Sequence, residues 1–200
     1  MLYDAILLGS RVFHTGEPLG WHYDSYFRDC PSPLLDDPEG LDIGRVHRVI
    51  EFVNQWRTHY QSSPEELLAG LRQVMPDLCA LGNETCLRVE LGRQCNDSET
   101  VGAVIERIFQ TVATCGRRYE STGASKILHV IHPDLFVMWD NAIAAGYAAG
   151  HPDAGGYRKT AQDYACRFLP RVQLVIRLTP EAGLSRRVNY WWRGETTGIV

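Results

Sequence analysis

Apolar side chains recur at helical spacing along most of the chain after residue 44. In residues 44–60, Val46, Val49, Ile50 and Val53 stand at i, i+3, i+4 and i+7, which predicts an amphipathic helix. Similar stripes predict a helix after Ser63, a helix that carries Val101 to Val112 on one face, and a long helix at 157–177. A short, largely buried helix is predicted at 124–132 and a further helix at 141–149. Alternation typical of strands is weak everywhere. We therefore predict an all-α fold, a multi-helix array in a single domain spanning residues 1–200.

Start and stop signals accompany several of these patterns. The run from Ser63 to Glu66 is a capping box with a proline at the first helical position, and Pro76 is expected to end that helix. Asp97 or Ser98 is expected to cap the helix that follows. Pro170 should kink or divide the last predicted helix.

The N-terminal quarter differs from this helical core. Residues 14–44 are rich in Gly, Pro and Asp, which predicts a loop-rich N-terminal segment (1–44) before a helical core (45–200). Residues 78–91 are ambiguous, and a short helix is favoured there. No apolar run approaches the roughly 18 residues of a membrane span, and the start of the chain lacks the features of a signal peptide. We therefore expect a cytoplasmic protein without a membrane partner.

Charge is distributed unevenly along the chain. Residues 1–116 contain 9 Arg and no Lys against 17 Asp and Glu, a net charge of −8. Residues 117–200 contain 11 Lys and Arg against 7 Asp and Glu, a net charge of +4. A basic C-terminal half permits a local anion-binding face, although the two halves could equally attract each other.

The cysteines suggest no metal or disulfide framework. None of them forms a C-x-x-C pair, and they are scattered through the predicted helices, so we expect inert buried thiols. The six are Cys30, Cys79, Cys86, Cys95, Cys115 and Cys166.

The most informative stretch begins upstream of the helix predicted at 124–132. Gly123 allows the backbone to turn, and Ser125 and Lys126 then fall in the first helical turn, where free N–H groups favour an anion. Arg117 and Arg118 precede them and would reinforce a phosphate site, although a solvated pair is the plainer interpretation. Lys126 could likewise be an ordinary solvated helix residue.

The same stretch ends in a carboxylate. Pro133 forces a change of direction, and the apolar loop 135–139 leads through Trp139 to Asp140 at the predicted start of another helix. Asp140 can cap that helix and still face a cleft beside Trp139. Capping alone is a common role for aspartate and is kept as an alternative.

A glycine turn, a lysine at a helix start and a proline-containing loop that ends in aspartate resemble the helix-hairpin-helix DNA glycosylase superfamily. The match covers about 25 residues. This chain has one glycine, three positions before Lys126, where the family usually has two, and its Lys126–Asp140 spacing is about one helical turn short. The resemblance implies an all-helical monomer that releases a modified or damaged base from DNA without a cofactor.

The resemblance also implies roles for particular residues. Asp140 would stabilise the cationic sugar as the base departs, and Lys126 would contact phosphate or act as a nucleophile. A flipped base needs apolar and aromatic surroundings. Residues expected to line the pocket or stack on bases are Trp139, Asn141, His129, Trp191 and Trp192. Since no iron–sulfur cysteine cluster is present, a specialised bacterial member acting on hypermodified phage bases is implied by analogy.

Two other classes of function remain open. A non-catalytic helical module that binds nucleic acid or a regulatory partner would leave Asp140 as a cap, with the C-terminal aromatic cluster sealing a core. A metal-dependent hydrolase could use His129, His132 and Asp140, although a third ligand at convincing spacing is missing.

Overall fold

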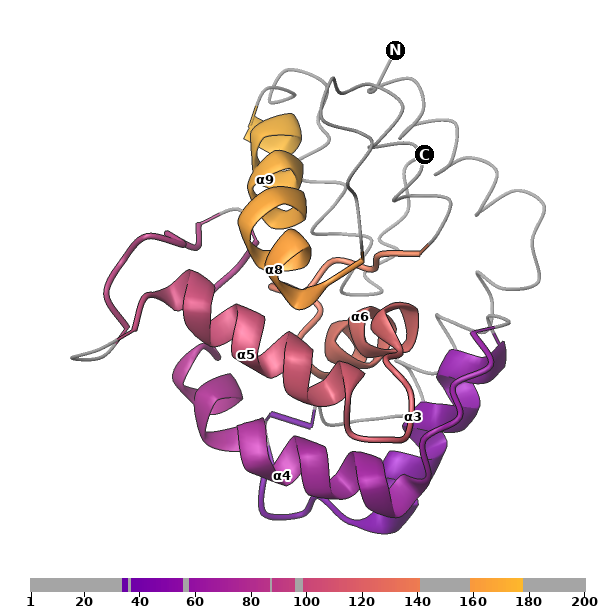
Figure 1. Cartoon of the computed structure of the whole chain (residues 1–200). Helices are drawn as coiled ribbons and strands as arrows, with labels where there is room; N and C mark the ends of the chain where they lie inside the picture. Colours follow the sequence, from indigo (N-terminus) through magenta and orange to yellow (C-terminus); the bar gives the residue numbers. More distant parts are fainter. Residues whose placement is uncertain are drawn as a thin grey trace, which may run out of the picture.

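The computed structural model describes residues 34–35, 37–55, 58–86, 88–95, 99–140 and 159–177. Within these residues 59% are helical, no sheet forms, and the helices pack against one another (Figure 1). The predicted all-α class is therefore confirmed. The helical elements are α3 (Ile43–Gln55), α4 (Pro64–Ala80), α5 (Val101–Ala113), α6 (Ser121–Ile131), α8 (Ala161–Asp163), the π-helix η2 (Tyr164–Phe168) and α9 (Leu169–Arg177).

Helix α5 is the centre of the packing. It contacts α4, α6, α8 and η2, and in Figure 1 it runs between α4 on one side and the α8–α9 helix on the other. Seven of its thirteen residues are buried, because its apolar positions form a wide stripe that meets neighbours on several sides. The buried set is Val101, Val104, Ile105, Ile108, Phe109, Val112 and Ala113.

The predicted start of α4 is confirmed, but its predicted end is wrong. Ser63 accepts a hydrogen bond from the Glu66 N–H, and the Glu66 carboxylate accepts one from the Ser63 N–H in return. The helix then continues through Pro76 to Ala80. Pro76 is exposed, so the carbonyl that it leaves without an intrahelical partner can bind water, and burial of Leu78 holds the last turn against the core.

Other predicted boundaries shift as well. Helix α3 ends at Gln55 rather than at residue 60, and His59 adopts a left-handed φ of 53° soon afterwards. Thr100 caps α5, its hydroxyl accepting from the Ala103 N–H, whereas the predicted caps at 97 and 98 lie outside the described residues. The short helix favoured at 78–91 is absent beyond Ala80, because the described residues there form turns.

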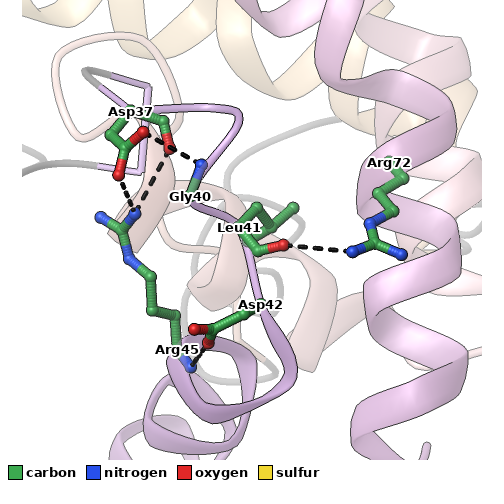
Figure 2. Close-up of polar contacts among 6 residues, drawn as sticks. All are labelled: Asp37, Gly40, Leu41, Asp42, Arg45 and Arg72. Carbon is green, nitrogen blue, oxygen red and sulfur yellow. Dashed lines mark hydrogen bonds and ion pairs between the residues drawn. The ribbon is translucent and has the colours of Figure 1, made fainter.

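A polar turn leads into α3. The Asp42 carboxylate accepts from the Arg45 N–H at 2.7 Å and so caps this helix (Figure 2). Asp37 holds the Arg45 guanidinium at 3.0 Å, and Arg72 of α4 donates to the Leu41 carbonyl at 3.4 Å. These contacts fix the chain that enters α3 against α4. Residues 1–33 and 36 of the loop-rich N-terminal segment lie outside the described residues.

The last helix contains a wide turn directly before its proline. In η2 the Leu169 N–H donates to the Tyr164 carbonyl, five residues back. Pro170 has no N–H to donate to the carbonyl four residues before it, and its ring would press on that carbonyl in a regular α-helix. The predicted disturbance at Pro170 is therefore present as a π-turn between α8 and α9.

Two further expectations concern the surface. None of the described helices combines the length and apolar character that crossing a membrane requires.

The described thiols are free but mostly not buried: Cys86 is buried, Cys95 and Cys115 are partly exposed, and Cys79 and Cys166 are exposed. The prediction of buried thiols is thus wrong for most of the described cysteines: Cys95 and Cys115 lie outside helices, and Cys79 and Cys166 lie at exposed helical positions.

Helix α6 begins at Ser121, three residues earlier than predicted, and contains Gly123 instead of following a glycine turn. Gly123 lies against the ring of Tyr60: a Cβ atom there would stand 2.3 Å from Tyr60 Cδ2. Tyr60 cannot easily move, because its N–H donates to Asn54 at 2.6 Å and its hydroxyl lies 3.0 Å from Cys115 Sγ. This glycine allows α6 to pack closely against Tyr60, in the segment between α3 and α4, and does not supply a backbone turn.

Replacing Gly123 with alanine should therefore destabilise the protein by about 1–3 kcal/mol, because overpacking outweighs the gain in helix propensity. Gly92→Ala is the matched control, since a Cβ at Gly92 would meet nothing within 4 Å. Its free energy of unfolding should change by less than about 0.5 kcal/mol. Urea denaturation of the three proteins measures both values. An alanine at Gly123 that leaves stability unchanged would contradict the packing role.

Candidate functional site

An extended backbone segment, residues 136–139, leads to Asp140 without belonging to a helix or a sheet. Buried polar groups of such a segment need partners from elsewhere. Three buried side chains supply them: Ser125 and His129, one turn apart on α6, and Tyr164 from η2. We call Ser125, His129 and Tyr164 the backbone clamp.

Ser125 holds the last residue before Asp140. Its hydroxyl oxygen accepts from the Trp139 N–H at 3.0 Å. The same hydroxyl donates to the Thr122 carbonyl at 2.9 Å, and the Trp139 carbonyl lies 3.3 Å from it. Because Ser125 is fully buried, it cannot contact a substrate as predicted. It positions the chain beside α6 instead.

His129 is a support of the same kind and not a pocket residue. Its Nδ1 donates to the Phe136 carbonyl at 2.7 Å, and burial lowers the pKa of His129 to about 4. His132 turns to another element, where its Nε2 donates to the Leu81 carbonyl at 3.0 Å. Among the described residues no group of three or more His, Cys, Asp or Glu side chains is placed to hold a metal ion.

Tyr164 completes the clamp, and the sequence pattern showed it only as one apolar position of a helix. Its hydroxyl donates to the Val137 carbonyl at 2.8 Å and accepts from the Val137 N–H at 2.9 Å. Burial raises the pKa of this hydroxyl, so it remains a donor. A buried tyrosine hydroxyl usually finds a partner, and this tendency was the available signal.

Trp139 belongs to the core and does not line an open pocket as predicted. It is fully buried, and its ring stacks on Phe168 with centroids 5.2 Å apart and planes at 16°. Tyr164 and Phe109 pack on other sides, with centroid distances of 5.6 Å and 6.4 Å. The indole thus anchors the residue that precedes Asp140 in the aromatic centre of the molecule.

Asp140 is half-buried and lies among lysines. Its negative charge raises the pKa of both Lys126 and Lys159, while burial, the larger effect, lowers both. The Lys126 ammonium also lowers the pKa of Lys159. The structure therefore places both Lys126 and Lys159 within electrostatic range of Asp140. We call Asp140, Lys126 and Lys159 the charged cluster.

Hydroxyl groups orient the two lysines. Lys126 Nζ donates to Thr58 Oγ1 at 3.0 Å, and Lys159 Nζ donates to Thr122 Oγ1. Thr122 and Lys126 stand at i and i+4 on α6, so they share one face of that helix. No sequence pattern indicated Lys159 as a site residue, because it falls within the range predicted as the last helix (157–177) and belongs to no motif; in the structure that helix begins only at Ala161.

The predicted phosphate-binding residues do not form one site. Lys126 lies in the second turn of α6 and is 7% exposed, so it does not stand at a free helix start as predicted. Arg117 and Arg118 are exposed in the α5–α6 loop, where they line a hollow of about 450 Å³ that Asp140 does not line. Asn141, Trp191 and Trp192 lie outside the described residues.

Comparisons with protein-family models, curated proteins and solved structures found no match to this chain. The arguments about function therefore depend on the chemistry of the residues themselves.

The buried His129 predicts a stability that falls in acid. Its pKa is about 4 in the folded protein against an ordinary value of 6.5, so between these values the unfolded chain binds a proton that the folded chain does not. The free energy of unfolding should therefore drop by about 2 kcal/mol between about pH 8 and pH 5. Urea denaturation at both pH values measures the drop. In His129→Gln it should shrink, leaving the contribution of His132, whose pKa is also lowered.

The charged cluster makes a separate prediction. Because the charge of Asp140 raises the pKa of Lys126 and of Lys159, Asp140→Asn should lower both pKa values further. NMR titration of the lysine side chains measures them. Asp134→Asn is the matched control: Asp134 acts on His132, so this variant should lower the His132 pKa and leave both lysines unchanged. If neither lysine pKa changes in Asp140→Asn, the carboxylate of Asp140 does not interact electrostatically with Lys126 or Lys159, and the charged cluster does not exist as described.

Proposed function

We propose that this chain is a DNA glycosylase that hydrolyses the N-glycosidic bond of a modified or damaged base, with Asp140 as the catalytic carboxylate. The observation that supports this proposal is the charged cluster. A carboxylate acts electrostatically on two lysines, directly after a segment whose backbone is held by the clamp. Such a carboxylate is suited to a reaction in which positive charge develops nearby.

Breaking an N-glycosidic bond creates that charge. The bond between the sugar C1′ and the base nitrogen breaks, its electron pair leaves with the base, and the sugar gains oxocarbenium character. A fixed carboxylate stabilises this cation most when it needs no rearrangement during the reaction. Water then adds to C1′ and its proton passes to solvent, which balances the proton taken up by the departing base, so the products are a free base and an abasic sugar.

The lysines have a role in the same step. A departing base needs a proton on the nitrogen that carried the sugar. Burial lowers the pKa of Lys126 and of Lys159, which makes their ammonium groups stronger acids than those of exposed lysines. In this proposal, one ammonium of the charged cluster donates to the departing base while Asp140 faces the sugar.

The class of base follows from the resemblance alone. The helix-hairpin-helix glycosylases act on altered bases in DNA, and a specialised member could remove hypermodified phage bases as a defence. A flipped base would be required, because the bond is otherwise inaccessible inside the stack.

A non-catalytic helical module is the competing function, and a specific observation favours it. Ser125, His129 and Trp139, three residues first expected at the substrate, are buried structural residues. The arginines that could bind nucleic acid line a separate hollow. A protein that only binds could share all of these features.

Asp140→Asn separates the two functions. Asparagine has nearly the shape of aspartate and would cap the helix predicted at 141–149, which lies outside the described residues, about as well; stability should therefore change little. Loss of the negative charge should slow base release by roughly a hundredfold to a thousandfold. Abasic sites formed in DNA that carries altered bases measure the rate, and a melting curve and a DNA-binding titration check the fold. Asp134→Asn, with the same change of charge earlier in the loop, should keep full activity.

The competing outcomes are distinct. Full base release by Asp140→Asn would reduce Asp140 to a structural residue and exclude the proposed mechanism. DNA binding by the parent protein without release of any altered base would favour the non-catalytic module.

A further inference from the structure

The hollow in the α5–α6 loop lies away from the carboxylate of the proposed reaction. Residues from 61–63 before α4, from the first turn of α4 and from the α5–α6 loop line it, and Figure 1 shows this loop beside the beginning of α4. Its volume of about 450 Å³ falls within the range of small-molecule sites. The lining residues are Gln61, Ser62, Ser63, Glu66, Arg117, Arg118 and Glu120.

The floor of the hollow is held in a fixed shape. The Glu120 carboxylate accepts from the Gln61 N–H at 2.8 Å, the Ser62 N–H at 3.2 Å and the Ser62 hydroxyl at 2.7 Å. Gly116 packs so closely that a Cβ there would stand 2.1 Å from Ser62 Oγ. The two segments are therefore joined before any ligand enters.

The polar groups of the lining divide into two kinds. Both carboxylates are engaged with the protein, Glu120 as above and Glu66 with the Ser63 N–H at 2.8 Å. Arg117 and Arg118 are exposed and make no hydrogen bond or ion pair with any described residue. Two adjacent guanidinium groups, each with several N–H donors, are thus the groups that a ligand would meet.

We propose that this hollow binds a phosphate group, carried by a nucleotide or by a nucleic-acid strand. Guanidinium groups match the geometry of phosphate oxygens, with two parallel N–H donors for each arginine. Because Glu66 and Glu120 offset the charge of the two arginines, recognition depends on direct contact more than on long-range attraction. The proposal that the hollow binds phosphate does not depend on the proposed function. The proposal that a DNA strand carries this phosphate does rest on the proposed function.

The position of α6 connects the hollow to the charged cluster. Glu120 lines the hollow, and Lys126 follows it by six residues, about 9 Å along a helix axis. At a rise of about 3.4 Å per nucleotide, a strand covers this length in two to three nucleotides. A strand whose phosphate occupies the hollow could therefore present a nucleotide two or three positions away to Asp140.

The double variant Arg117→Ala/Arg118→Ala tests the proposal against Arg88→Ala, an exposed arginine in the segment beyond the opposite end of α4. One arm follows the guanidinium N–H signals of Arg117 and Arg118 by NMR during titration with inorganic phosphate and with a nucleoside monophosphate. The other arm measures binding of a labelled DNA strand across a salt series. Melting curves check the fold of each variant.

Phosphate binding should shift the signals of both arginines in the parent and in Arg88→Ala. Strand binding by the double variant should weaken at all sequences alike, with the slope against salt reduced by about one for each lost phosphate contact. If the nucleoside monophosphate shifts the guanidinium N–H signals of the parent but the double variant binds the DNA strand as the parent does, the phosphate that occupies the hollow belongs to a free nucleotide. Absence of shifts together with unchanged strand binding overturns the proposal. A parent protein that binds phosphate but releases no altered base would count against the glycosylase alone.

Discussion

The backbone of residues 136–139 crosses the interior outside any regular element, and the rest of the candidate site depends on how its polar groups are satisfied. Each group left without a partner there would cost about 1–3 kcal/mol, a large share of the stability of a typical domain. Ser125, His129 and Tyr164 meet this demand from two helices. The position of Asp140 is consequently fixed by contacts made at the residues before it.

This constraint explains why α6 carries polar side chains on a buried face. Nine of its eleven residues are buried, including Ser125, Lys126 and His129. In the sequence these side chains looked like site residues, because polar groups within an apolar run often serve chemistry. Two of them serve the backbone instead, and Lys126 alone reaches the charged cluster. A buried polar residue therefore has two physical explanations, and only its partner decides between them.

Helices with strong apolar stripes and local caps could be predicted, since both signals act within a few residues. The capping box at Ser63 and the stripe of α5 are examples. Effects that depend on distant segments could not be predicted in this way. The Tyr60 ring that requires a glycine at 123 is far from Gly123 in the sequence, and the Thr122 hydroxyl that holds Lys159 is far from Lys159. Lys126 and Asp140 could be paired in advance only through the resemblance, because 14 residues of sequence set no spatial distance.

The π-turn of η2 also sets the rotational register of the last helix. One residue of an α-helix corresponds to about 100° of rotation, and a π-turn accommodates one residue more than an α-turn. The extra residue lets Tyr164 face Val137 while Leu169 and Val172, beyond the turn, still face the core. In a straight α-helix one extra residue would rotate the following half away from the core. Here the extra residue of the π-turn leaves the side chains on both sides of the turn facing inward. The phase difference between α8 and α9 is what allows one helix to hold the extended segment and pack against the core.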